Sequence, residues 1–561
     1  MSCRSGLILP ATLLITACNS SPQPAVERIA VITFDNQTPD PSAAWVGDAV
    51  AQTMVAQLSG APSLAAVLAS NREDASREHA ARVVMGYVAN EGVELRAHAA
   101  LRTAAGKHLR DIEARAHDPA GLAHALARAL WPDAPDQPTA NAEALRLFAE
   151  GARSRNARDL RASIAASPGF GPARLALVQV LSLGGDREAA RAAIHEAAAD
   201  PALDAATHAR FVASEAAAAG PAERLATLEK LAALTPAHPE AFIQAAGAAM
   251  ALRQFGKGAA HLETATRLDP ASPDPWNELG YARAFGGDLR GATDALAVYG
   301  RLVPASGNPL DSVGEVNWLH GHFAEAERAF LEAYEKSPGL LRAATLRKAA
   351  EARLIAGDRA GAQPLFERYR DAVASSPLAT LSALQWKWST GDEAGAMAEA
   401  RALARESKSS LAWSQLAIWL TAEGKPEAAE AAEAAVKIAR TPAESANGAI
   451  AAFVSQADTS VEEWKRRSES APGPLRNRAL AWALILHKHY ADAVPVLEKL
   501  STSSGLIEFS QWRALAGWAS REAGDKVKAK ELLAQWPVPS SEGTLFDSLI
   551  FPAVATWRVG L

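Results

Sequence analysis

The chain has 561 residues, a net charge of -6 at pH 7, two cysteines and only 6% aromatic residues. This length exceeds what one compact core holds, so it predicts several domains or a repetitive fold that grows by adding units. A mildly negative chain without a basic, aromatic-interleaved stripe disfavours nucleic acid as a partner. Both cysteines, Cys3 and Cys18, lie at the amino terminus, which excludes disulfides and thiolate metal sites from the rest of the chain.

Residues 1–17 have the composition of an export signal. Arg4 precedes an apolar run, Leu7 to Ala17, that is too short to cross a bilayer as a mature helix. The last residues before Cys18 read Leu-Ile-Thr-Ala and resemble a bacterial lipobox, whose cysteine is diacylated and becomes the new amino terminus. The alternative is an ordinary signal peptide with an incidental cysteine.

The lipobox resemblance implies a lipid anchor at Cys18 and no membrane span. Several acyl chains on one residue are enough for stable anchoring. Asn19 follows the cysteine, which in Gram-negative lipoproteins favours the outer membrane, facing the periplasm. Residues 18–25, rich in Ser and Pro, are then the lipidated cysteine and a tether.

Residues 26–131 predict a small α/β domain, because short β-branched runs alternate with helical patterns. The expected order is β-α-β-α-β-β-β-α, and the gaps near Asn90 and Gly106 are hairpin signals. The expected strands are 28–34, 64–68, 83–88, 93–101 and 108–116, and the expected helices are 44–58, 71–81 and 119–131.

A proline-rich linker, residues 132–140, is expected to end the domain. Helical patterning then continues over residues 141–537, and its centre has a fixed period. Four prolines recur every 34 residues: Pro236, Pro270, Pro304 and Pro338. A period of this length is typical of stacked helix pairs, and the turn signals predict about ten or eleven of them.

The repeats resemble the tetratricopeptide repeat (TPR) family. The best copy carries the bulky, small and closing positions of that pattern at Trp276, Leu279, Gly280, Ala292, Leu296 and Pro304. It departs from the pattern at Arg283 and Tyr299. The implied fold class is mainly α, a TPR-type α-solenoid preceded by a small α/β domain. Residues 538–561 are expected to fold back as a cap on the last repeat.

The opening of the α/β domain carries a resemblance of its own. Its run from Ile29 to Asn36, followed by Trp45-Val-Gly-Asp48, is similar to the domain preceding TPR arrays in bacterial adenylate-cyclase-like regulators. It is also similar to the amino-terminal domain of the TolB family. Neither family implies catalytic residues here.

Motifs for catalysis and metal binding give no positive signal. The sequence has no Gly-x-Ser-x-Gly elbow, phosphate-binding loop or His-Glu-x-x-His motif. The pairs His320/His322 and His487/His489 could chelate a metal, but both fall at the turn of a repeat, which favours polar turn chemistry. We therefore expect that the protein is not an enzyme and that it binds no cofactor and no metal.

The first helix of each pair lines the groove in TPR arrays, and projecting that pattern predicts a partner-binding groove. Aromatic side chains beside charged ones suit an extended peptide or a partner helix. The alternative is that most of these rings are core, as we expect for Trp276 and Trp413. The predicted groove residues are Tyr281, Phe285, Trp318, Arg347, Glu351, Trp388, Trp482 and Trp518, with Glu315, Gln385, Arg478 and Arg521 beside them.

These features predict a lipid-anchored envelope scaffold or adaptor that binds another protein in an assembly, export or signalling complex. The Lys and Asn clamp of chaperone-binding TPR grooves is missing, which argues against a carboxyl-terminal acidic ligand. One alternative is an envelope hydrolase, or its regulator, with a site at the domain junction around Asp35, Asp40 and Asp48. Another is a sensor whose α/β domain binds a small molecule.

Overall fold

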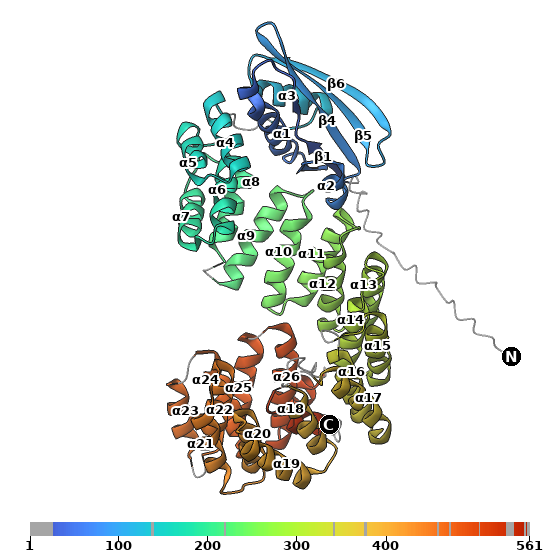
Figure 1. The fold of residues 1–561 in the computed structure, drawn as a ribbon, viewed down its shortest axis with the longest axis vertical. Helices are drawn as coiled ribbons and strands as arrows, with labels where there is room; N and C mark the ends of the chain where they lie inside the picture. The colour runs from blue at the N-terminus through green and yellow to red at the C-terminus, as the bar shows by residue number, and fades with distance from the viewer. Residues whose placement is uncertain are drawn as a thin grey trace, which may run out of the picture. The chain divides into compact units, whose positions relative to one another are not determined.

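The computed structural model describes residues 26–135, 140–217, 220–339, 343–374, 378–456, 459–470, 473–503, 505–534, 544–554 and 557 (Figure 1). The predicted signal, tether and Cys18 lie outside the described residues, as does part of the predicted linker. The chain forms two compact units, Met1–His208 with Leu234–His238, and Ala209–Ala233 with Pro239–Leu561. Among the described helices, none combines the length and hydropathy needed to cross a bilayer.

The first unit begins with a six-stranded sheet in the order β3-β1-β4-β5-β6, with β2 paired to β4 (Figure 1). β1 pairs in parallel with β3 and β4, whereas β4, β5 and β6 are antiparallel. The strands are β1 (Glu27–Ile32), β2 (Asp35–Asn36), β3 (Leu64–Ala69), β4 (Arg82–Glu91), β5 (Glu94–Thr103) and β6 (His108–Ala116). The helices are the 3-10 helix η1 (Pro41–Ala44), α1 (Trp45–Leu58), α2 (Arg72–Arg77) and α3 (Pro119–Leu130).

Alternation along β1 places its side chains in two cores. Ile29 and Val31 pack with residues of α1 and α3, whereas Ala30 and Ile32 pack in the cluster that includes Ala75 of α2. The predicted α/β domain is therefore confirmed. The short strand β2 was not among the expected strands, and it pairs with Tyr87 and Val88 of β4.

The remaining described helices form twelve consecutive helix pairs, slightly more than predicted. In chain order they are α4 (Ala142–Ser154), α5 (Ala157–Ala166), α6 (Gly171–Leu183), α7 (Arg187–Ala198), α8 (Ala205–Glu215), α9 (Pro221–Leu234), α10 (Pro239–Ala251), α11 (Phe255–Leu268), α12 (Pro273–Phe285), α13 (Leu289–Leu302), α14 (Asn308–Leu319), α15 (Phe323–Lys336), α16 (Ala343–Ile355), α17 (Arg359–Ala372), α18 (Leu378–Ser389), α19 (Glu393–Glu406), α20 (Ser410–Ala422), α21 (Ala428–Ile438), α22 (Pro442–Val454), α23 (Val461–Glu469), α24 (Gly473–Leu486), α25 (Tyr490–Ser503), α26 (Leu506–Glu522) and α27 (Lys526–Leu532). A final helix, α28 (Asp547–Val554), follows the pairs.

The small and turn positions of the repeat have direct physical causes. A Cβ at Gly280 would lie 2.7 Å from the side chain of Leu296, so α12 and α13 approach closely only because this residue is glycine. Gly287 has a φ of 90° in the turn, and the next residue, Asp288, caps α13 by accepting from the Gly291 amide at 2.8 Å. These local features determine how closely the two helices of a pair pack and where the turn between them lies.

The second unit also contains a contact between repeats far apart in the sequence. Arg253 donates to Ser501 O at 2.8 Å, and its guanidinium lies 4.5 Å from the ring of Phe509. The same ring lies 5.8 Å from Phe255 and 6.0 Å from Phe285. α25 and α26 are thus held beside α11, α12 and the turn between α10 and α11 within this unit.

Candidate functional site

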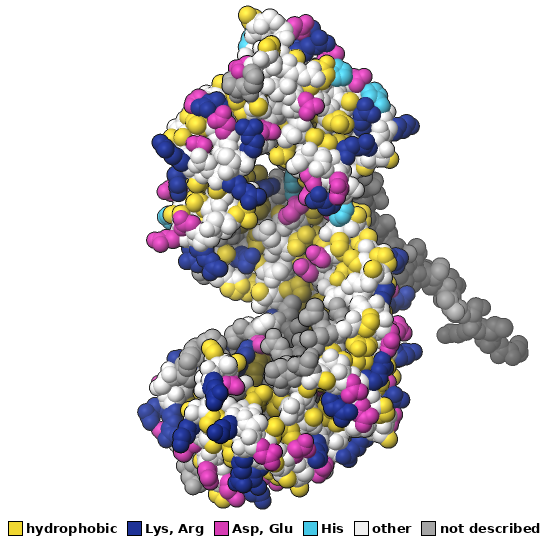
Figure 2. All heavy atoms as spheres, viewed as in Figure 1, with side chains coloured by type: hydrophobic (Ala, Val, Ile, Leu, Met, Phe, Trp, Pro, Cys, Tyr) yellow, Lys and Arg dark blue, Asp and Glu magenta, His cyan; other side chains and the backbone are white. Residues whose placement is uncertain are grey.

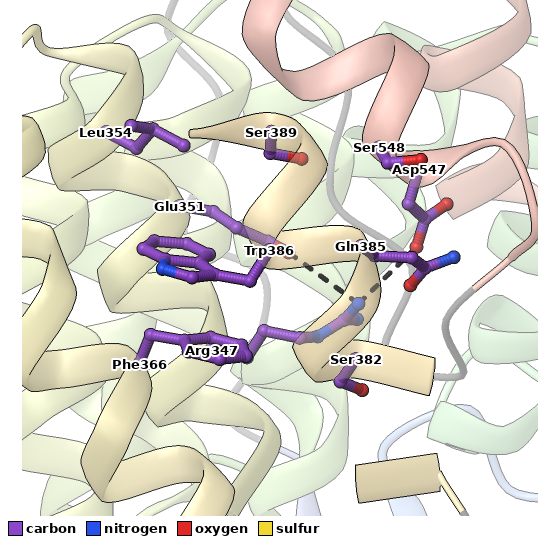
Figure 3. A pocket seen from close by; sticks show the side chains of 10 residues that line it. All are labelled: Arg347, Glu351, Leu354, Phe366, Ser382, Gln385, Trp386, Ser389, Asp547 and Ser548. Atoms are coloured by element: carbon purple, nitrogen blue, oxygen red, sulfur yellow. Dashed lines mark hydrogen bonds and ion pairs between the residues drawn. The ribbon is translucent and has the colours of Figure 1, made fainter. Parts of the chain in front are cut away.

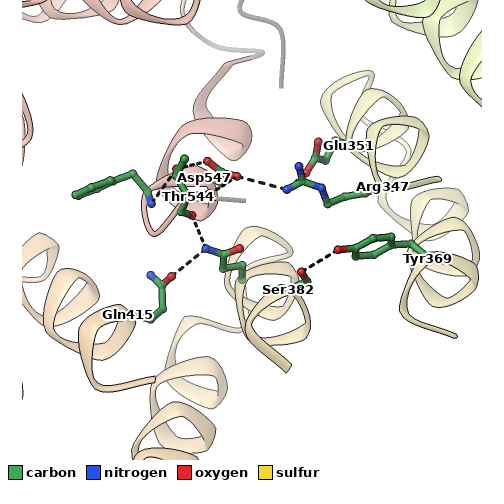
Figure 4. A network of polar contacts seen from close by, with 9 residues as sticks. Arg347, Glu351, Tyr369, Ser382, Gln415, Thr544 and Asp547 are labelled. Atoms are coloured by element: carbon green, nitrogen blue, oxygen red, sulfur yellow. Dashed lines mark hydrogen bonds and ion pairs between the residues drawn. The ribbon is translucent and has the colours of Figure 1, made fainter. Parts of the chain in front are cut away.

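The C-terminal segment, described over residues 544–554 and at Trp557, lies in the second unit against the first helices of several pairs. We use the name inner face for the first helices α12, α14, α16, α18, α20, α24 and α26, of which the segment contacts α16 and those that follow it. Besides Arg347, three inner-face side chains donate to the segment: Gln385 Nε2 to Thr544 O at 2.6 Å, Gln415 Nε2 to Leu545 O at 2.9 Å, and Trp419 Nε1 to Ser548 Oγ at 3.0 Å. The segment therefore contacts helices from α16 to α26, beyond the last pair that we predicted it would cap. Figure 4 shows its polar contacts around Thr544 and Asp547.

A buried arginine joins the segment to α16. Arg347 NH1 lies 3.4 Å from Asp547 Oδ2 and 3.6 Å from Glu351 Oε1, and all three side chains are buried (Figure 3). Burial raises the pKa of Glu351 to about 7, against the lowering effect of Arg347. Burial likewise raises the pKa of Asp547, again opposed by Arg347. This charge cluster lines a cavity of about 20 Å³, which has room for a single water.

The segment is capped at the start of its helix. Asp547 Oδ2 accepts from the Thr544 amide at 3.0 Å, and the Thr544 hydroxyl also bonds to the Asp547 carboxylate. The carboxylate that pairs with Arg347 therefore also fixes the first turn of α28. The Arg347 contact thus depends on a local helix start.

Aromatic rings cover the rest of the segment. Trp482 of α24 stacks on Phe546 with centroids 4.1 Å apart and an interplanar angle of 2°. Trp518 of α26 lies 6.0 Å from Trp557. Between these rings is a mainly apolar cavity of about 170 Å³, which Ala553 also lines.

Farther along the inner face, a second charge cluster lies within the solenoid. Lys348 Nζ lies 2.5 Å from Glu315 Oε1 and 2.9 Å from Asp311 Oδ1, and Tyr281 donates its hydroxyl to Glu315. Burial lowers the pKa of Lys348, but the two carboxylates outweigh it and hold that pKa above its usual value. Burial and the Glu315 charge raise the Tyr281 pKa well above its usual value.

The predicted groove residues fall into two groups. Arg347, Glu351, Trp482 and Trp518 contact the C-terminal segment or lie in its charge cluster. Tyr281 is half-buried and paired inside the solenoid, and the other three are buried between helices: Phe285 against Phe255, Trp318 against Phe323, and Trp388 stacked on Trp419.

Several contact residues were not predicted. Gln415 and Trp419 of α20 and Lys348 of α16 carry no motif, and only their long-range contacts reveal them. The spacing Thr544-x-x-Asp547 is a recognisable helix start and could have marked the segment as more than a tail.

Two other predicted neighbours of the groove also link the first helices of successive pairs. Gln385 also donates to Gln415 at 2.9 Å, and Arg478 pairs with Glu508 at 2.6 Å. The two rings that we expected in the core, Trp276 and Trp413, are partly buried and pack against core clusters.

The histidine pairs join neighbouring repeats. His320 Nε2 donates to Ala284 O at 3.0 Å, and His487 Nε2 donates to Val454 O at 2.9 Å. Each bond runs to the first helix of the preceding pair. Across the described part of the chain, no three potential ligands group at metal-binding distance.

The acids named for a hydrolase site lie in the first unit. Asp35 is in β2, Asp40 precedes η1, and Asp48 is in the first turn of α1, where an acid suits the helix terminus. Burial raises the pKa of Asp48, and Arg153, 3.7 Å away, opposes this.

On the face shown in Figure 2, basic and acidic side chains are interspersed.

No protein-family model matches the chain, and no curated protein is significantly similar to it in sequence. Solved structures of TPR proteins are similar to part of it. MamA is 19% identical over 31% of this chain and 96% of its own, with a TM-score of 0.28. YrrB, described as a TPR protein with an unusual peptide-binding site, is 18% identical over 34% of this chain and 96% of its own, with a TM-score of 0.27.

A tetratricopeptide repeat protein from Parabacteroides merdae is 12% identical over 43% of this chain and 98% of its own, with a TM-score of 0.31. Likenesses this partial carry no conclusion about what the chain binds. The fold class is an α-solenoid of helix pairs with the TPR period, preceded by a small α/β domain, as the repeat period and the strand patterns predicted.

Proposed function

We propose that this protein is a scaffold whose inner face binds a helical segment of another protein. The observation that carries the proposal is the C-terminal segment itself. Side chains of α16, α18, α20 and α24 hold a short helix by an ion pair, hydrogen bonds to its backbone carbonyls and a ring stack. A groove that holds one helix in this way has the chemistry to hold another.

The proposal includes an envelope location. The lipobox-like sequence before Cys18 supports export and lipid anchoring, and Asn19 supports the outer membrane. Metabolic labelling with an acyl-chain probe tests this: the wild type should be labelled, and Cys18→Ala should lose both the label and the membrane fraction. Unchanged fractionation of Cys18→Ala would contradict the anchor.

Site-specific photo-crosslinking in intact cells tests the groove. A photoreactive residue at Lys488, which lines the apolar cavity and is exposed, should capture one protein reproducibly. The matched control is the same residue at Arg368, an exposed position of α17 paired with Glu335. The captured protein, once purified, should bind the wild type and bind Gln415→Ala more weakly. Equal capture at both positions would contradict the proposed function.

A further inference from the structure

The inner face recognises the C-terminal segment in two ways. Gln385 and Gln415 bond to backbone carbonyls, which any residue supplies. The stack of Trp482 on Phe546 and the ion pair of Arg347 with Asp547 select side chains. The surface therefore prefers an aromatic residue followed directly by an acid at a helix start.

The segment fills this surface incompletely. A cavity of about 170 Å³ remains beside Ala553, Trp482 and Trp518, and rings and aliphatic side chains form most of its wall. A half-open apolar pocket of this kind offers contacts that a side chain larger than alanine would make.

Two indole N–H groups near this surface also meet no acceptor among the described residues, one of the segment's own Trp557 and one of Trp512, whose ring lies 6.2 Å from that of Trp482. Both groups are buried. A buried donor without an acceptor is costly. The space beside Ala553 leaves room for an occupant with a larger apolar side chain.

We propose that residues 544–557 are a self-ligand, which a partner helix of the same pattern displaces. This inference rests on the proposed function. The partner helix carries an aromatic residue, an acid directly after it, and an apolar side chain larger than alanine seven residues after the aromatic. That last side chain enters the cavity beside Ala553, so the partner binds more tightly than the segment.

Full-length protein and synthetic peptides test the self-ligand. The probe is a fluorescein-labelled peptide spanning residues 544–557, compared with the same peptide carrying Ala553→Leu. The proteins are the wild type, a Phe546→Ala/Asp547→Ala variant whose own segment is loosened, and that variant with Arg347→Met added. Circular dichroism and thermal unfolding show that each protein stays folded.

The loosened variant should bind the peptide at least tenfold more tightly than the wild type, because its own segment competes less. The Ala553→Leu peptide should bind about tenfold more tightly still, since it fills the cavity. Adding Arg347→Met should reduce binding by tenfold or more. If Arg347→Met destroys helicity, Gln415→Ala replaces it, with an expected loss of about fivefold.

Three outcomes would overturn the self-ligand. Folded wild-type and loosened proteins that bind the peptide equally would make the segment a fixed part of the fold. An Ala553→Leu peptide that binds no more tightly than the unchanged peptide would show that the cavity takes no part in recognition. A wild type that forms dimers dissociated by excess peptide would make a second copy the occupant. In each case, a partner crosslinked at Lys488 but not at Arg368 would leave the proposed function intact.

Discussion

Adjacent residues of α16 are buried cations with different partners. Lys348 lies between Asp311 and Glu315, both on α14. Arg347 lies between Glu351 of its own helix and Asp547 of the C-terminal segment. One cation is neutralised inside the repeat array, and the other depends on a residue 200 positions away.

The difference separates two roles of the inner face. Around α12 and α14 the polar groups satisfy one another, so that part is closed and serves the fold. From α16 onward the polar and aromatic groups are satisfied by an added helix, which can in principle leave. Polar side chains that pair with one another within the repeats stabilise the fold. Polar side chains that pair with an added helix indicate a binding surface.

The largest expected effect compares Lys348→Met with Arg347→Met. Lys348→Met leaves two buried carboxylates without a cation and should cost about 3–5 kcal/mol of unfolding free energy in urea titration. Arg347→Met should cost less globally, because Asp547 can leave with the segment. Its effect should appear as faster amide hydrogen exchange in α28. Equal global losses would contradict the distinction.

Phe546→Ala and Phe330→Ala compare the same chemical change in the segment and in the repeat core. Phe330 is fully buried between α14 and α15, and its removal should cost about 3–5 kcal/mol of global stability. Phe546→Ala should release α28, seen as faster exchange there and a change in tryptophan fluorescence, with the helix pairs preserved. A cooperative global loss in both variants would show that the segment is core.

The third prediction is that docking of the segment weakens as pH rises from about 5 to 7. The pKa of Glu351 is raised to about 7 in the docked state, mainly by burial, and should fall toward its usual value when Asp547 leaves. The docked state then binds an extra proton in this window, so rising pH favours undocking by up to about 1.4 kcal/mol per unit.

The charged groups that face Glu351 do not reverse this pH dependence of docking. Asp547 has a raised pKa, whereas Arg347 and Lys348, whose pKa values are also raised, stay charged throughout the window. Hydrogen exchange of α28, corrected for intrinsic rates, measures the opening. Glu351→Gln should flatten the dependence, and an opposite slope in the wild type would refute this assignment.

The smallest expected effect comes from single hydrogen bonds. Gln415→Ala removes the bond to Leu545 O and should weaken docking by about 1 kcal/mol. Arg368→Ala removes an exposed pair with Glu335 and should change neither docking nor stability by more than about 0.5 kcal/mol. Equal effects of the two variants on amide hydrogen exchange in α28 would show that Gln415 does not contribute to docking.

Much of the fold was predictable because its signals are local. The alternation in β1 and the hairpin at Asn90 gave the sheet, and the period marked by Pro270 and Pro304 gave the helix pairs. Four of the eight predicted groove residues lie where the C-terminal segment docks. Phe285, Trp318 and Trp388 share the same helix-face pattern, but long-range neighbours such as Phe509 bury them or pack beside them.

The sequence by itself determined the building blocks of this protein: an α/β domain with five strands and three helices in the predicted chain order, and helix pairs with glycine turns and capped starts. These follow from contacts a few residues apart, which a linear pattern records. Only the tertiary structure decided that Asp547 meets Arg347 and that Phe546 lies on Trp482. Those contacts join the end of the chain to earlier repeats, and no periodicity specifies which face a distant helix occupies.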